Sequence, residues 1–323
     1  MAPLPIAILG AGPAGMACAD ALLSFGLTPV VIERSAEPGG AQRGNFHPNL
    51  WLLGTPAESG EAMTARMTAQ FRQLPIAVHA ATEVTAVRRA AAGFVLDLAG
   101  PDAPASLTAA AIVLCTGMRP RATPELTALA GQSARVLIGP LAPVIRDGIR
   151  AGRVLILGGG DNAFDHALFL AERGNRIVVC ARSAFSARAG FQAACAGRPD
   201  IELRPHCRAD ALQADAAGIR LLLAGRPESF DWLLVLYGYQ PNTEGLAAFA
   251  ADIRPALSDG GHIEVDRAQR TSVAGVYAAG DVTETVQPAV ATAIAQGLAA
   301  ARTVERDLRG GAQAQNIAAS TSR

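Results

Sequence analysis

Two stretches of the chain share one pattern of hydrophobic and polar positions. Residues 6–35 (IAILGAGPAGMACADALLSFGLTPVVIERS) and residues 154–183 (VLILGGGDNAFDHALFLAERGNRIVVCARS) align in register without a gap. Each stretch begins with an apolar run, continues through a glycine-rich turn into a segment with helical spacing of apolar residues, and ends in a second apolar run. The pattern predicts the opening strand, helix and strand of a βαβ unit in both places.

The glycine-rich turns carry the chemistry of this unit. Gly10 permits a tight turn, Gly12 lets the backbone approach a pyrophosphate, and Gly15 lets the helix pack closely on the strand. The matching positions of the second stretch are Gly158, Gly160 and Ala163. In this geometry the N-terminus of the helix faces the anion and stabilises its charge. Two copies in the same context therefore predict two dinucleotide-binding domains.

The two copies differ where the second apolar run ends. Glu33 of the first copy can accept hydrogen bonds from ribose hydroxyls, which suits the adenosine ribose of FAD. In the second copy Ala181 takes its place and is followed by Arg182, with Arg188 six residues further on. Guanidinium groups without the carboxylate favour a 2′-phosphate, so we expect NADPH rather than NADH. The alternative is that both arginines are solvated loop residues.

Composition and charge narrow the possibilities. The chain has 323 residues, half of them hydrophobic, which is enough for two domains of ordinary size. No apolar run reaches about 18 residues, and the N-terminus lacks a signal sequence, so we expect a cytoplasmic protein with no membrane segment. The formal net charge is zero, which gives no indication of a nucleic-acid partner. All 28 basic residues are arginine, which excludes Schiff-base catalysis and a lysine-bearing phosphate loop.

The cysteines form no recognisable motif. There are five of them, Cys18, Cys115, Cys180, Cys195 and Cys207, with no CxxC and no Cys/His cluster at metal-ligand spacing. We therefore expect neither a disulfide framework nor a metal site. The first three are interpreted as buried packing residues. Cys195 and Cys207 remain candidates for a redox-active pair.

A third element completes the pattern. Residues 271–281 (TSVAGVYAAGD) predict a strand that ends at Gly280 and Asp281, followed by a helix from about Gln287 to Leu308. Together with GAGPAG, the Thr116–Gly117 pair, GGGDNA and GYQPN at 238–242, this order of motifs resembles the thioredoxin reductase-like pyridine-nucleotide flavoproteins over essentially the whole chain.

The resemblance implies an α/β fold of two Rossmann-like, three-layer dinucleotide-binding domains, with the NAD(P)H domain inserted into the FAD domain. The FAD domain would comprise residues 1–117 and 242–323, and the NAD(P)H domain residues 121–237. The two connections between them each contain glycine and proline, as hinge segments often do. A homodimer is expected by the same analogy.

The resemblance also implies which residues contact each cofactor. Asp281 would bind the ribitol or phosphate part of FAD, and amides near Gln287 and Ala289 would face the flavin pyrimidine, where a helix N-terminus stabilises negative charge. The segment Pro38–Gln42 resembles the family's PGGQ, with Ala41 inserted before Gln42. The expected FAD contacts are Gly10, Gly12, Pro13, Ala14, Gly15, Glu33, Arg34, Gly40, Gln42, Asn45, Val84, Thr116, Gly117, Gly280, Asp281, Gln287 and Ala289. The expected NADPH contacts are Gly158, Gly160, Asp161, Asn162, Ala163, Arg182, Ser183 and Arg188.

The dithiol of the thiol-dependent members is missing. Thioredoxin reductases proper carry a CxxC just ahead of the second glycine-rich turn, and the glutathione reductase type carries its dithiol soon after the first. Residues 121–153 and 36–60 contain no cysteine, so the flavin has no internal thiol relay of either kind. The motif at 158–168 and the aromatic segment at 45–56 are similar to those of thioredoxin-reductase-type ferredoxin (flavodoxin)–NADP reductases. The latter segment would place Phe46, His47 or Trp51 near the flavin.

These patterns predict an FAD-dependent oxidoreductase. Hydride would pass from NADPH to the flavin, and electrons would continue to a ferredoxin- or flavodoxin-like carrier or to a small acceptor such as a quinone. No residue is assigned as a general acid or base, because the transfer from nicotinamide to flavin is direct. The alternatives are a disulfide reductase that uses thiols outside a CxxC, such as Cys195 or Cys207, and a non-enzymatic redox sensor that binds both dinucleotides.

Overall fold

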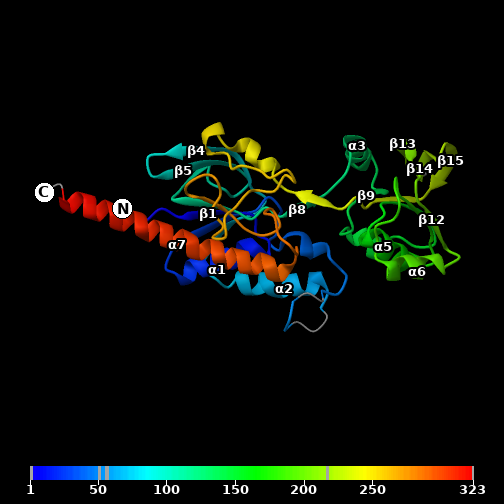
Figure 1. The fold of residues 1–323 in the computed structure, drawn as a ribbon, viewed down its shortest axis with the longest axis horizontal. Helices are drawn as coiled ribbons and strands as arrows, with labels where there is room; N and C mark the ends of the chain where they lie inside the picture. Colours follow the sequence, from blue (N-terminus) through cyan, green and yellow to red (C-terminus); the bar gives the residue numbers. More distant parts are fainter. Residues whose placement is uncertain (1–2, 50–51, 55–57, 216–217, 322–323) are drawn as a thin grey trace. The chain divides into compact units, whose positions relative to one another are not determined.

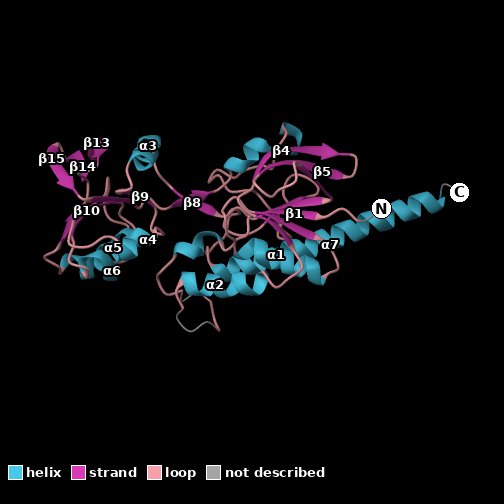
Figure 2. Cartoon of the chain, turned by 180° about the vertical axis from the view of Figure 1, so that it is seen from behind, coloured by secondary structure: helices cyan, strands magenta, loops and turns pink. Residues whose placement is uncertain are grey.

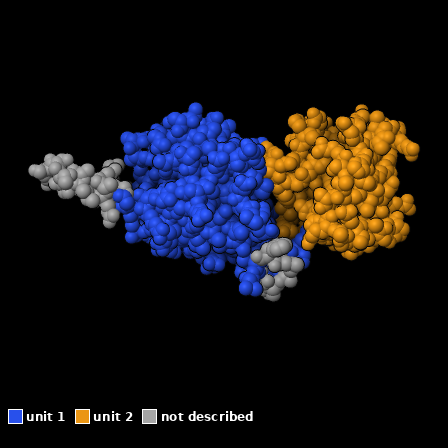
Figure 3. Space-filling view, viewed as in Figure 1, with its two compact units in different colours: residues 1–43, 47–118, 241–323 blue, residues 44–46, 119–240 orange. Residues whose placement is uncertain are grey.

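The computed structural model describes the chain except for residues 1–2, 50–51, 55–57, 216–217 and 322–323 (Figure 1). The residues cluster into two compact units, which Figure 3 draws in different colours. Unit 1 comprises Met1–Arg43, His47–Met118 and Pro241–Arg323, and unit 2 comprises Gly44–Phe46 and Arg119–Gln240. Along the chain, unit 2 is therefore inserted into unit 1.

The centre of unit 1 is a parallel sheet of five short strands in the order β18-β7-β1-β2-β3. The strands are β1 (Ile6–Leu9), β2 (Pro29–Ile32), β3 (Ala77–His79), β7 (Ala111–Leu114) and β18 (Val276–Ala278). All but β3 are buried along their whole length. Both faces of the sheet are covered, which is why these strands are continuous apolar runs rather than alternating ones.

Unit 1 has three layers. Helices α1 (Pro13–Ser24), α2 (Gly60–Phe71) and α7 (Val290–Thr321) cover one face of the parallel sheet (Figures 1 and 2). An antiparallel sheet of β4 (Glu83–Ala90), β5 (Gly93–Ala99) and β6 (Ser106–Ala109) covers the other. Within β1, Ile6 and Ile8 pack against the helices, whereas Ala7 and Leu9 pack toward the antiparallel sheet.

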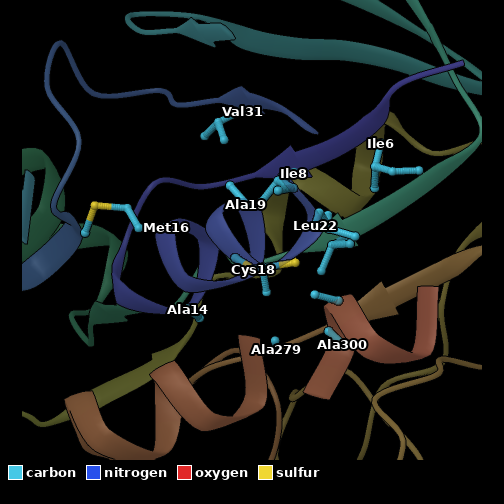
Figure 4. Close-up of a cluster of buried hydrophobic side chains, with 14 of the residues drawn as sticks. Ile6, Ile8, Ala14, Met16, Cys18, Ala19, Leu22, Val31, Ala279 and Ala300 are labelled. Atoms are coloured by element: carbon cyan, nitrogen blue, oxygen red, sulfur yellow. The ribbon is translucent and has the colours of Figure 1, made fainter. Parts of the chain in front are cut away.

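Helix α7 packs closely against α1 in the core of unit 1. Figure 4 shows Ala14 and Cys18 of α1 in one buried cluster with Ala300 of α7. The approach is close enough that a Cβ atom on Gly297 would lie 2.3 Å from the backbone oxygen of Ala14. Only glycine fits between the two helices at this position.

We therefore expect Gly297→Ala to lower the free energy of unfolding by about 1–3 kcal/mol, because the methyl group forces α7 away from α1. This loss exceeds the gain of at most about 1 kcal/mol that alanine brings to a helix interior. Gly310→Ala in the same helix is the matched control, since a Cβ there meets no atom within 4 Å. Denaturant unfolding of both variants should show a loss for the first and no loss for the second. Equal midpoints would contradict the close helix contact.

Unit 2 repeats this plan. Its parallel sheet has the order β12-β11-β10-β16-β9. The strands are β9 (Val136–Ile138), β10 (Arg153–Leu157), β11 (Arg176–Cys180), β12 (Ile201–Arg204) and β16 (Trp232–Val235). One face carries the helices α4 (Pro143–Asp147), α5 (Asp161–Ala171) and α6 (Ala189–Ala196) (Figure 2). The other face carries α3 (Pro124–Gln132) and an antiparallel sheet of β13 (Ala209–Asp215), β14 (Gly218–Leu223) and β15 (Arg226–Phe230).

Both predicted βαβ openings are confirmed, as β1-α1-β2 in unit 1 and β10-α5-β11 in unit 2. The α/β architecture of two three-layer domains, one inserted into the other, is confirmed as well. Two paired strands, β8 (Met118–Pro120) and β17 (Tyr239–Pro241), connect the units along the chain. The described residues also form the short 3₁₀ helices η1 (Gly40–Gly44), η2 (Glu244–Ala248) and η3 (Ala251–Ile253).

The last helix differs from its predicted bounds. It begins at Val290 rather than Gln287, because a residue that precedes proline, as Gln287 does, disfavours the helical backbone conformation. The Ala289 amide donates to the Thr292 hydroxyl at 3.0 Å, a bond typical of a helix N-cap. It also continues to Thr321 instead of ending at Leu308, through an alanine-rich sequence that favours helix. Within the described part of the chain, no helix has the length and hydrophobicity needed to cross a lipid bilayer.

Candidate dinucleotide-binding sites

The glycine-rich turn of unit 1 has the backbone geometry that the sequence predicts. Gly10 has φ 106°, and a Cβ there would lie 2.4 Å from the Cys115 oxygen. A Cβ on Gly15 would lie only 1.9 Å from the Gly10 oxygen, so α1 packs directly on the turn. Gly12 is the N-cap of α1, and a Cβ there would lie 3.8 Å from the Gly40 Cα, an ordinary van der Waals contact. The amides at this helix end are therefore accessible to an anion.

Pro13 and Ala14 form the first turn of α1. Proline suits this position because its fixed φ is helical and its missing N–H would have no partner there. Ala14 is buried, and its small side chain allows the close approach of α7.

Glu33 lies at the end of β2, next to this turn. Its buried carboxylate accepts hydrogen bonds from the amides of Ala11 and Ser35, both at 2.7 Å. These bonds hold the side chain in place but leave each oxygen a second lone pair for a ribose hydroxyl. The neighbouring Arg34 is exposed.

Asp281 follows β18, and its carboxyl has a buried oxygen that a ligand could satisfy. Its Oδ1 atom is buried and has no hydrogen-bond partner among the described residues. Burial raises the pKa of this carboxyl, and the nearby His262 partly offsets the rise. Buried acceptors in native proteins are almost always satisfied, so a hydroxyl-bearing ligand such as the ribitol of FAD fits this position. Gly280, with φ 82°, turns the chain here and donates its amide to Gln296.

The other predicted FAD contacts have varied surroundings. Gly40 in η1, with φ 64°, lies against Gly12, and Gln42 is half-buried in the same 3₁₀ helix. Val84 is half-buried on β4. Gln287 is exposed, and the amide of Ala289 is already used by Thr292. Of the two amides proposed to face the flavin, that of Ala289 is therefore engaged within the chain.

Thr116 and Gly117 are hydrogen-bonded to Asn242, so they join the two chain segments that run between the units. The Thr116 hydroxyl donates to the Asn242 oxygen at 2.8 Å, and the Asn242 amide donates to the Gly117 oxygen at 2.9 Å. Gly117 has φ 65°, a conformation that favours glycine.

The start of the aromatic segment that follows η1 packs within unit 2. Asn45 and Phe46 cluster with unit 2, where the Phe46 ring lies 4.9 Å from Phe169 and 6.0 Å from His166 between ring centroids. Phe46 therefore packs against α5, and its expected position near the flavin stays a prediction. The expectation for Trp51 falls outside the described residues.

The glycine-rich turn of unit 2 repeats the first turn. A Cβ on Gly158 would lie 2.3 Å from the Leu236 oxygen, and Gly160 is the N-cap of α5. Ala163, at the position of the third glycine, is fully buried. Asn162 is exposed beside this helix end. Polar contact with a pyrophosphate is thus available at both turns.

The two arginines of unit 2 have different partners. Arg188 donates from its backbone N and from Nε to the Asp161 carboxylate, at 2.8 and 2.6 Å, which ties its loop to the start of α5. The Arg182 guanidinium lies over the Tyr237 ring at 5.4 Å, and among the described residues no carboxylate pairs with it. Ser183 is exposed beside it. Arg182 is therefore the better placed of the two to meet a 2′-phosphate.

Sequence reasoning missed a cavity of about 550 Å³ within unit 2. It lies between α3, the ends of β10 and β11, and the start of β13, and its lining includes Arg182, Tyr237, Cys180 and Cys207. The signal that could have indicated it is Cys180, which stands two residues before Arg182.

All five cysteines are buried free thiols. Burial raises the pKa of Cys18 well above its usual value, that of Cys115 to about 12 and that of Cys195 to about 11. Cys195 contacts the Phe164 oxygen on the helical face of the unit 2 sheet, whereas Cys207 lies in the core of the opposite face. The interpretation of Cys195 and Cys207 as a redox-active pair is therefore wrong.

The structure combines two glycine-rich turns at helix N-termini with the Glu33 carboxylate at the end of β2 and the Asp281 carboxyl after β18. These features define a class of protein that binds two dinucleotides. The sequence profile of the pyridine nucleotide-disulphide oxidoreductases matches residues 4–297, and the chain belongs to this family.

Individual relatives agree with this assignment. A ferredoxin–NADP reductase of Limosilactobacillus fermentum is 30% identical over 292 residues, which cover 85% of this chain and 84% of that protein. A ferredoxin–NADP reductase of Salinispora tropica is 27% identical over 295 residues, covering 88% and 87%. The thioredoxin reductase of Lactococcus lactis, in its FR conformation, matches with a TM-score of 0.78 at 20% identity, over 95% of this chain and 99% of that one. The latter likeness shows the fold.

This membership confirms the predicted enzyme class and the use of FAD and a nicotinamide dinucleotide. The protein is a flavoprotein oxidoreductase that depends on FAD and NAD(P)H.

Proposed function

We propose that this protein takes electrons from NADPH and delivers them to a ferredoxin- or flavodoxin-like carrier protein. The observation that carries the proposal is the state of the cysteines. All five are buried, and none belongs to a CxxC, so none forms a surface dithiol that the disulfide of a protein substrate such as thioredoxin could reach. The ferredoxin–NADP reductases among its relatives support the same acceptor class.

Unit 1 is proposed as the FAD domain. The N-terminus of α1 at Gly12 would face the pyrophosphate, Glu33 would accept hydrogen bonds from the ribose, and Asp281 would bind the ribitol. When bound, FAD can accept a hydride and release electrons singly, which is the chemistry that a one-electron carrier requires. Glu33 and Asp281 would orient the cofactor, and the N-terminus of α1 would stabilise the negative charge of its pyrophosphate.

Unit 2 is proposed as the NADPH domain. The N-terminus of α5 at Gly160 would face the nicotinamide dinucleotide's pyrophosphate, and Arg182 would pair with the 2′-phosphate. The bond between Arg188 and Asp161 would hold the intervening loop in position. Arg182 would thus recognise the 2′-phosphate, and Arg188 would keep the loop in its conformation.

Arg182→Ala should raise the Michaelis constant for NADPH by about 10- to 100-fold and leave that for NADH nearly unchanged, because only NADPH carries the lost partner of the guanidinium. Arg188→Ala should weaken both nucleotides to a similar, smaller extent, since it releases the loop from Asp161. Steady-state kinetics with both nucleotides measure this. Equal effects of Arg182→Ala on NADPH and NADH would refute the 2′-phosphate assignment.

The proposed function is tested by anaerobic stopped-flow spectroscopy of the purified holoprotein. NADPH should bleach the flavin absorbance rapidly, and mixing with oxidised ferredoxin or flavodoxin should restore it within a few turnovers. Oxidised thioredoxin is the negative control and should leave the flavin reduced. Reoxidation by thioredoxin, or no reoxidation by either carrier protein, would overturn the proposed acceptor. Slow bleaching by NADPH despite full FAD occupancy would favour the redox sensor.

A further inference from the structure

The cavity of unit 2 has an apolar wall and a polar mouth. Leu126 and Leu129 of α3 form part of the wall together with Leu212 of β13. Arg182 and Arg208 lie at the exposed side, where both side chains reach solvent. A volume of about 550 Å³ is within the range of small-molecule sites. The cavity therefore suits a compact ligand with an apolar group.

Two thiols line this cavity together. Cys180 ends β11, and Cys207 lies in the connection from β12 to β13. The Cys207 amide donates to the Ala181 oxygen at 2.9 Å, which aligns the two segments. The Cys180 Sγ lies 3.2 Å from the Cys207 carbonyl oxygen, and both residues line the cavity. Residues 27 positions apart in sequence thus form one pair.

The surroundings disfavour the thiolate form of Cys180. Burial, and then the contact with the Cys207 thiol, raise the pKa of Cys180 to about 12. Cys180 is therefore in its thiol form at neutral pH, whereas disulfide exchange requires the thiolate. A reaction that begins and ends with uncharged species avoids this obstacle, because no charge is buried in the cavity.

We propose that Cys180 and Cys207 form a two-thiol binding site for a trivalent organoarsenical, whose apolar substituent occupies the cavity. In this condensation R–As(OH)₂ reacts with two thiols to give R–As(S–Cys)₂ and two molecules of water. Two As–O bonds break and two As–S bonds form, the thiol protons leave in the water, and no atom changes oxidation state. All species are neutral, as the apolar wall requires.

Binding of the arsenical also weakens the binding of NADPH, an inference that rests on the proposed function. Arg182, the proposed 2′-phosphate ligand, and Tyr237, on which it lies, both line the same cavity. A ligand bound to the thiols therefore competes for the space beside Arg182. The arsenical acts as an inhibitor that raises the Michaelis constant for NADPH.

The experiment uses holoprotein treated with one equivalent of phenylarsine oxide and freed from excess reagent. The protein is unfolded without reductant, alkylated with N-ethylmaleimide and mapped by peptide mass spectrometry. Cys180 and Cys207 should stay unmodified, whereas Cys18, Cys115 and Cys195 should be alkylated. Addition of 2,3-dimercaptopropanol before unfolding should restore alkylation of all five cysteines.

Cys180→Ala and Cys207→Ala should each weaken retention of the arsenical by about 100-fold or more, because one thiol alone lacks the second attachment. Cys195→Ala is the matched control and should bind like the wild type, since its thiol lies in the other core of unit 2. Alkylation of all five cysteines in the treated wild type, or protection of a different pair, overturns the site; this readout needs no variant to fold. Protection of Cys180 and Cys207 without any change in NADPH kinetics leaves the thiol site intact and refutes instead the placement of the 2′-phosphate beside it.

Discussion

Gly15→Ala should leave the purified protein with little FAD and destabilise unit 1 by about 3 kcal/mol or more. The added methyl carbon would lie 1.9 Å from the Gly10 oxygen, so α1 must move away from the turn or the turn must reshape. Both changes displace the helix N-terminus that is proposed to face the pyrophosphate. The ratio of flavin to protein absorbance measures occupancy, and denaturant unfolding measures stability.

The second repeat supplies the control. Ala163 occupies the matching position in unit 2 and is fully buried, so that turn already accommodates one methyl group. Ala163→Gly should cost about 1–2 kcal/mol from the lost helix preference and the lost buried methyl group, and should leave FAD occupancy unchanged. Full flavin occupancy in Gly15→Ala would show that the first turn does not hold the FAD.

Asp281→Ala should lower the affinity for FAD by about 10- to 100-fold, because it removes an acceptor that the ribitol hydroxyls would satisfy. Its effect on the apoprotein should have the opposite sign. Without FAD the buried Oδ1 has no hydrogen-bond partner among the described residues, and the carboxyl is poorly solvated. Removal of the side chain should therefore leave apoprotein stability unchanged or higher.

Titration of apoprotein with FAD and thermal unfolding of the same apoprotein separate these two effects. Asp259→Ala, at an exposed acid of the same unit, should change neither quantity. A destabilised apoprotein with normal FAD affinity would indicate that Asp281 has a structural role instead.

The sequence alone determined the local framework of this protein. The strand and helix of each repeat follow from short-range hydrophobic periodicity. The turn follows from glycines such as Gly10, whose positive φ is unfavourable for any residue with a Cβ atom. Glu33 could be predicted for the same reason, since it directly follows a buried strand beside the turn. The missing dithiol was also visible, because a CxxC is a sequence motif.

Tertiary structure decided which distant residues meet. Cys207 lies beside Cys180 and not with Cys195 because the order of strands in the sheet places the end of β11 next to the segment before β13. Hydrophobic periodicity contains no information about that order. The pairing of Arg188 with Asp161 and the unsatisfied Oδ1 of Asp281 likewise depend on how separate segments pack, which sets the distances and the burial that local sequence patterns do not encode.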